Sequence, residues 1–122
     1  MRALPRGGPY YGMMLGLLRN PVGRDQIDLV SIMAYNAGSR YDPLVSYEAY
    51  RNYYRGPILI GFTPPPESWG DHAYTDQEVK AVLRAGLSRG AAGAMLFSLR
   101  RMPMVDGITP MVNVIATALS SD

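Results

Sequence analysis

The chain has 122 residues, of which 48% are hydrophobic, so it can bury the core of one small domain and lacks the composition of a disordered protein. Its net charge is +2, and its eleven Arg and single Lys form no dense basic run, which argues against nucleic acid as a partner. It contains no Cys, which excludes disulfides, thiolate metal sites and cysteine nucleophiles.

The N-terminal segment lacks the features of a targeting or membrane sequence. No apolar stretch follows its arginines as in a signal peptide, which leaves the cellular compartment undetermined. The apolar run at 13–18, MMLGLL, is too short to span a bilayer, so we expect no membrane contact. We expect residues 1–9 to be loose and residues 10–19 to form a short helix that ends at the Asn20-Pro21 break.

The first strand and the helix after it are predicted between residues 28 and 55. DLVSIMA at 28–34 has the apolar character of a buried strand. A helix follows over 46–55, with Ser46 as its N-cap, and the Tyr-rich sequence gives it an aromatic face. That face comprises Tyr47, Tyr50 and Tyr54.

Two further strand-and-helix pairs follow. ILIGF at 58–62 predicts a strand covered on both faces, and the loop at 63–74 separates it from a helix. Thr75 and Glu78 form a capping box at the start of that helix, which stops at Gly90. Its core-facing residues are Val79, Val82, Leu83 and Leu87.

The last pair begins with a third strand at 93–98, GAMLFS. Thr109 is the expected cap of a final helix that Pro110 opens. The residues expected to face the core from this helix are Met111, Val112, Ile115 and Leu119.

The repeated order of strand and helix indicates the α/β class, with a single domain over residues 1–122. The strand centres lie about 30 to 35 residues apart, which is typical of βαβ units with parallel strands and right-handed crossovers. Such units build either an α/β barrel or a doubly wound sheet. No G-x-G-x-x-G or G-x-x-x-x-G-K-[ST] follows a strand, so a nucleotide-binding sheet is disfavoured and no cofactor is predicted.

Polar and aromatic side chains follow each predicted strand. Because the carboxyl ends of parallel strands meet at one side of a sheet, these side chains are expected to gather there. Aromatics mixed with acids, amides and Arg suit a carbohydrate, whose ring faces stack while its hydroxyls need donors and acceptors. The other interpretation is that Tyr35 is an interior residue and Asn36 a turn former. The set comprises Tyr35, Asn36, Arg40, Tyr41, Asp42, Glu67, Trp69, His72, Arg100 and Arg101.

Two other patterns carry less weight. Gly86 to Gly90 match G-x-S-x-G by letter, but Ser88 would stand at a helix end rather than between a strand and a helix. His72 is the single histidine of the chain and has no partner spacing for a metal site, so no metal is predicted.

The run DLVSIMAYN resembles strand six of glycoside hydrolase family 18, the chitinases and their relatives, where a hydrophobic strand ends in M-x-Y-D, M-x-Y-N or Q-x-Y-N. Met33, Tyr35 and Asn36 match that pattern in register. PILIGF resembles strand seven of the family, and GAMLFSL resembles strand eight, typically G-x-M-x-W-S. The resemblance covers about residues 20 to 119 and implies the last three βα units of a (β/α)8 TIM barrel.

The resemblance implies a retaining hydrolysis in which the N-acetyl group of the sugar assists, on chitin or N-acetylglucosamine oligosaccharides. Tyr35 would position the acetamido group and Asn36 would support it. Met33 would line the subsite, and Phe97, where the family has Trp, would give a weaker stacking floor. The further expected sugar contacts are Tyr41, Asp42 and Trp69.

The general acid of the family is missing. Its strand-four motif, D-x-x-D-x-D-x-E, is absent, and Asp25 and Asp28 precede a strand rather than lying along one. Glu67, flanked by Pro66 and close to Trp69, is the candidate replacement. The competing interpretation is a solvated loop acid.

Three hypotheses about function therefore remain: a chitinase-like enzyme, a non-catalytic carbohydrate-binding or structural remnant, and a truncated gene product. Three parallel strands alone would leave two apolar edges open. We therefore expect a homo-oligomer, in which oligomerisation or strand exchange completes a larger barrel.

Overall fold

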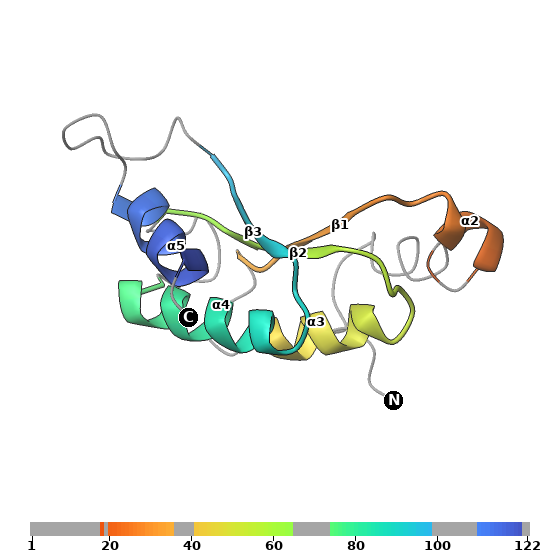
Figure 1. Ribbon diagram of the computed structural model, residues 1–122, viewed down its shortest axis with the longest axis horizontal. Helices are drawn as coiled ribbons and strands as arrows, with labels where there is room; N and C mark the ends of the chain where they lie inside the picture. Colours follow the sequence, from red (N-terminus) through yellow and green to blue (C-terminus); the bar gives the residue numbers. More distant parts are fainter. Residues whose placement is uncertain (1–17, 19, 36–40, 65–73, 99–109, 121–122) are drawn as a thin grey trace.

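The computed structural model describes residues 18, 20–35, 41–64, 74–98 and 110–120. They form an α/β fold in which three parallel strands alternate with helices (Figure 1), as the sequence predicts. The strands are β1 (Val30–Met33), β2 (Ile58–Phe62) and β3 (Gly93–Leu96). The helices are α2 (Pro21–Asp25), α3 (Pro43–Arg51), α4 (Asp76–Ser88) and α5 (Pro110–Ser120).

The strands lie in the order β1-β2-β3, so that neighbours in the chain are neighbours in the sheet. Val30 pairs with Ile58, and Gly61 pairs with both Met33 and Met95. Within the described residues the sheet is open, because β1 and β3 pair with β2 alone. The predicted strand at 58–62 has the predicted bounds, whereas those at 28–34 and 93–98 are shorter than expected.

One face of the sheet packs on the helices. Along β1, Val30 and Ile32 are buried while Ser31 and Met33 are exposed, which is the two-residue alternation of a strand with one covered face. Figure 1 shows α3 and α4 on the same side of the sheet, and α5 packs beside α4. The second face therefore carries large side chains that stay accessible.

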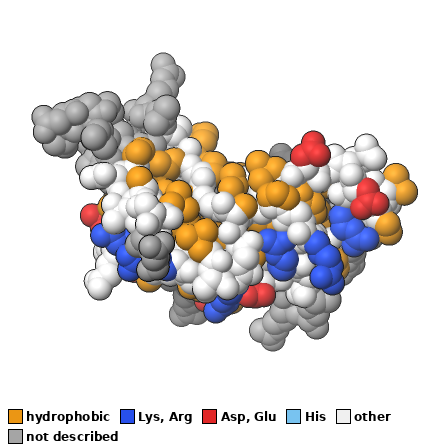
Figure 2. All heavy atoms as spheres, viewed as in Figure 1, with side chains coloured by type: hydrophobic (Ala, Val, Ile, Leu, Met, Phe, Trp, Pro, Cys, Tyr) orange, Lys and Arg blue, Asp and Glu red, His pale blue; other side chains and the backbone are white. Residues whose placement is uncertain are grey.

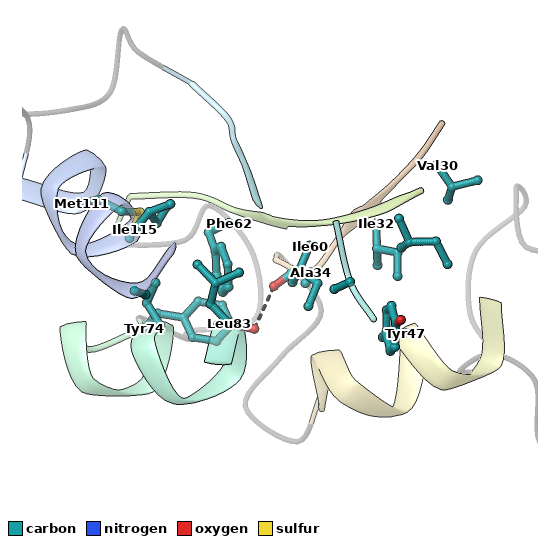
Figure 3. Close-up of a cluster of buried hydrophobic side chains, with 14 of the residues drawn as sticks. Val30, Ile32, Ala34, Tyr47, Ile60, Phe62, Tyr74, Leu83, Met111 and Ile115 are labelled. Atoms are coloured by element: carbon teal, nitrogen blue, oxygen red, sulfur yellow. Dashed lines mark hydrogen bonds between the residues drawn. The ribbon is translucent and has the colours of Figure 1, made fainter. Parts of the chain in front are cut away.

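The core lies between the sheet and the helices (Figure 3). Ile58, Ile60 and Phe62 of β2 are fully buried, and so are Tyr47 of α3 and Leu83 of α4. Burying such a side chain contributes about 1.5–3 kcal/mol, so β2 anchors the two helices to the sheet.

The start of α3 differs from the prediction. Asp42 rather than Ser46 is the N-cap, and its side chain accepts a hydrogen bond of 2.9 Å from the backbone N–H of Leu44. Pro43 occupies the first turn, where its fixed φ favours helix and its missing N–H costs nothing. Ser46 lies inside the helix and is buried.

The end of α3 also differs, because the helix stops at Arg51 and leaves Tyr53 and Tyr54 beyond it. The Arg51 guanidinium donates to the carbonyls of Tyr54, Gly56 and Gly90, at 3.2, 2.6 and 3.1 Å. These bonds hold the chain after α3 in a turn that enters β2, which explains why the helix does not continue to residue 55.

The capping box of α4 is confirmed. The Thr75 side chain accepts from the Glu78 backbone N–H at 3.1 Å, and the Glu78 carboxylate accepts from the Thr75 N–H at 2.7 Å. Gly90 follows the helix with a φ of +100°, a conformation that side chains disfavour, so the predicted stop is also confirmed.

The core face of α5 is only partly as predicted. Met111 and Ile115 are buried, but Val112 and Leu119 are exposed at 36% and 46%. Ala118 takes the third buried position because α5 packs against α4, where a small side chain permits close approach.

A helix that the sequence analysis missed precedes β1. Asn20 and Pro21, interpreted as a break, begin α2: the Asn20 side chain accepts from the Val22 N–H at 3.0 Å. The predicted helix at 10–19 falls outside the described residues except for Leu18, and the Thr109 cap falls outside them as well. In the part of the chain that the structure covers, no helix has the length and apolar character needed to cross a bilayer.

Candidate functional site

Two aromatic rings meet at the carboxyl ends of the strands. The rings of Tyr35 and Phe97 stack with their centroids 6.1 Å apart and their planes 10° from parallel. They follow β1 and β3, so the pair spans the central strand β2. The backbone there remains paired, since the N–H of Ala34 donates to Gly61 and that of Phe97 donates to Phe62. The structure thus brings together two of the predicted site residues.

Gly61 leaves space above β2 beside this pair. A Cβ at Gly61 would lie 2.6 Å from the Ile32 carbonyl oxygen and 2.7 Å from the terminal methyl of Met95. The Met95 side chain therefore occupies the space that a side chain of β2 would fill. Met33, on the other side of Gly61, is 64% exposed.

The surface around this pair is apolar, and Phe97 rather than Tyr35 is its accessible ring, because Tyr35 is only 6% exposed. Phe97 is 52% exposed, and Met33 lies two residues before Tyr35, on the same face of the sheet. In Figure 2, hydrophobic side chains run across the molecule at the level of the sheet, while Lys and Arg side chains lie below them, toward the helices. An aromatic and thioether surface of this kind can hold the apolar face of a sugar ring.

Tyr35 supplies the polar group of the pair. Burial raises the pKa of its hydroxyl above the usual value of 10.0, because burial disfavours the charged phenolate. The hydroxyl is therefore protonated at neutral pH and can donate a hydrogen bond to a carbonyl oxygen.

Tyr41 and Asp42, two predicted sugar contacts, are engaged with α3. The Tyr41 side chain shares a hydrogen bond with Ser46, and burial, the largest cause, raises the pKa of its hydroxyl. Asp42 caps the helix through the Leu44 N–H. These contacts are structural, and a role of either residue in sugar binding stays a prediction.

Asn36, Glu67 and Trp69 lie outside the described residues, as do His72 and the Arg100-Arg101 pair. Among the residues that the structure describes, no three His, Asp or Glu side chains gather in a way that could hold a metal ion. Of the predicted site residues that the structure describes, Met33, Tyr35 and Phe97 lie at the carboxyl ends of the strands, and Tyr41 and Asp42 lie at the start of α3.

The sequence analysis missed Tyr74. Its buried hydroxyl donates a 2.8 Å hydrogen bond to the carbonyl of Ala34, directly before Tyr35, and its ring packs edge-on against Phe62. Tyr74 precedes the Thr75 cap, a position where a hydrophobic staple is common, so the sequence indicates a packed ring there but not the hydrogen bond to Ala34.

Two clefts lie at the opposite end of the strands. One of about 490 Å³ is lined by Arg51, Arg55 and Gly90 among others, and the second, about 560 Å³, includes Arg24 and Asp28. Both are at the amino ends of the strands, whereas ligands of parallel α/β folds bind at the carboxyl ends.

Comparisons with family models, curated proteins and solved structures found no match for this chain.

Proposed function

We propose that the chain is a chitinase-like segment, similar to glycoside hydrolase family 18, that binds N-acetylglucosamine polymers at the carboxyl ends of its strands. The observation that carries this proposal is the stacking of Tyr35 on Phe97 beside the exposed Met33. The exposed Phe97 ring offers a face on which a sugar can pack, and the hydroxyl of the buried Tyr35 beneath it suits the oxygen of an acetamido group.

The arrangement of the helices supports a partial (β/α)8 barrel over a doubly wound sheet. A doubly wound sheet carries helices on both faces, whereas every helix of a barrel lies outside and the strands face inward. Here α3 and α4 lie on one side of strands that follow chain order (Figure 1). The face with Met33 and Phe97 corresponds to the barrel interior.

In the catalytic form of this proposal, the substrate supplies its own nucleophile. Tyr35 holds the acetamido group, supported by Asn36, so that its oxygen attacks the anomeric carbon and configuration is retained. Glu67 protonates the leaving oxygen as general acid. Its position, three residues after Pro64, is on the segment that follows β2.

A second candidate function is binding without catalysis. The absence of D-x-x-D-x-D-x-E from the chain favours it, because that motif carries the acid of the family that the sequence resembles. The aromatic pair would then serve as a carbohydrate-binding surface alone.

Titration with chitotetraose, followed by calorimetry, tests binding. We expect Phe97→Ala to weaken affinity about 2- to 10-fold, because this is the change that the loss of one aromatic contact produces. Tyr35→Phe keeps the ring and should weaken affinity about fivefold through the lost hydrogen bond. Val45→Ala, at a position in α3 that is 54% exposed, is the matched control and should leave affinity unchanged. Affinity equal in all four proteins, or none in the parent chain, contradicts the proposal.

Turnover separates the two candidate functions. If the chain hydrolyses chitooligosaccharides, Glu67→Gln should abolish the reaction while Glu48→Gln, an exposed α3 carboxylate paired with Arg89, should not. Chitotetraose binding without any turnover favours the binding function. Hydrolysis that survives in Glu67→Gln excludes Glu67 as the acid.

A further inference from the structure

Two buried tyrosines hold the two ends of β1. The Tyr54 hydroxyl donates a 3.0 Å hydrogen bond to the carbonyl of Ile27, before the strand. The Tyr74 hydroxyl donates a 2.8 Å hydrogen bond to the carbonyl of Ala34, after the strand (Figure 3). β1 pairs with a single described neighbour, and these two hydrogen bonds fix the backbone just before and just after it.

The bond from Tyr74 falls at the last residue before the aromatic pair. Ala34 is fully buried, and its N–H already donates to Gly61. Its carbonyl needs a partner of its own, because an unpaired buried carbonyl is costly. The carbonyl of Ala34 and the nitrogen of Tyr35 belong to the same planar peptide unit. The hydrogen bond therefore fixes the orientation of the peptide plane to which Tyr35 is attached.

Tyr74 is itself well fixed. Its ring meets that of Phe62 edge-on, with centroids 5.4 Å apart and planes at 85°. Thr75, the next residue, caps α4. Contacts with β2 and α4 therefore fix the position of the Tyr74 hydroxyl. The hydrogen bond from this hydroxyl in turn fixes the backbone at the end of β1.

We propose that Tyr74 is a positioning residue for the Tyr35–Phe97 pair. By holding the Ala34–Tyr35 peptide, it directs the Tyr35 ring onto Phe97. The consequence for sugar binding rests on the proposed function, whereas the consequence for the two rings does not.

Tyr74→Phe tests this proposal in the full 122-residue chain, and Tyr54→Phe is its matched control. Each variant keeps a buried ring and removes one hydroxyl that donates to a main-chain carbonyl. The first readout is the nuclear Overhauser contact between the Tyr35 and Phe97 rings, measured without ligand. The second is the affinity for chitotetraose, and the third is the thermal midpoint.

We expect both variants to lower the thermal midpoint, since each loses a buried hydrogen bond. Only Tyr74→Phe should weaken the contact between the two rings, and only it should lower chitotetraose affinity, by about tenfold. A lowered midpoint in both variants, with the ring contact intact in both, would make Tyr74 a purely structural residue and overturn the proposal.

The sugar readout is separable from the ring readout. If the parent chain binds no chitotetraose, the proposed function fails, but a ring contact that disappears in Tyr74→Phe alone still supports the positioning role. If the parent chain binds and Tyr74→Phe binds equally well with its rings still in contact, the positioning role fails while the proposed function stands.

Discussion

The hydroxyl of Tyr35 gives stability a specific dependence on pH. Burial raises its pKa above 10.0 in the folded chain, so the unfolded chain loses this proton first as the pH rises. The contribution is constant below a pH of about 10, and the free energy of unfolding falls as the pH rises from there through the folded pKa. Tyr35→Phe should remove this part of the fall, as measured by urea unfolding across that range.

A second tyrosine provides the control for that measurement. Burial also raises the pKa of Tyr41. Tyr41→Phe should therefore remove a different part of the fall in the free energy of unfolding at alkaline pH, and the double variant should remove both parts. An alkaline slope in Tyr35→Phe equal to that of the parent chain would contradict the link to Tyr35.

At the scale of residues, the sequence predicts that Tyr35 follows the first strand and that Phe97 lies at the end of the third, and the structure brings these two rings together. Parallel strands bring their carboxyl ends to one side, so the alternation of side chains is enough to place both on the same face. The bond from Tyr74 to Ala34 could not be predicted in this way. It joins residues 40 positions apart, and it depends on how the segment before α4 packs against β1.

At the scale of elements, Asp42 has a helix-capping role that can be separated from sugar binding. Asp42→Ala should lower the free energy of unfolding by about 1 kcal/mol, whereas Asp42→Asn, which still caps, should cost only a few tenths. Chemical denaturation measures both. Asn as damaging as Ala would mean that the carboxylate charge, rather than the cap, stabilises the chain. Chitotetraose affinity in Asp42→Asn then tests the predicted sugar contact by itself.

Sequence patterns predict some boundaries of the helices and strands but not others. The bounds of β2 follow from an apolar run that Gly56 and Pro57 precede, so they are predicted correctly. The start of α3 is not, because Asp42 and Ser46 are both good caps and only the structure shows Asp42 in use. In α5 the prediction chose Leu119 by hydrophobicity, but packing on α4 selects the smaller Ala118.

At the scale of the whole molecule, the described helices α3 and α4 lie on one side of a sheet whose edge strands, β1 and β3, each pair with β2 alone. Three parallel strands are confirmed. The apolar run 58–62 predicts a strand covered on both faces, whereas the described helices α3 and α4 lie on one side of it. Parallel sheets in other proteins are covered on both faces, and exposed edges invite pairing. The exposed Met33 and Phe97 lie on the face that a complete barrel would enclose.

We therefore expect the 122-residue chain to associate in solution through this face and the edges of β1 and β3. Light scattering at micromolar concentration should give a mass above that of one chain. Met33→Lys should shift the distribution toward smaller species, because association would bury the added charge. Val45→Lys, on an exposed position of α3, is the control and should leave the mass unchanged. A monodisperse monomer for the parent chain would contradict completion of the barrel by a second copy.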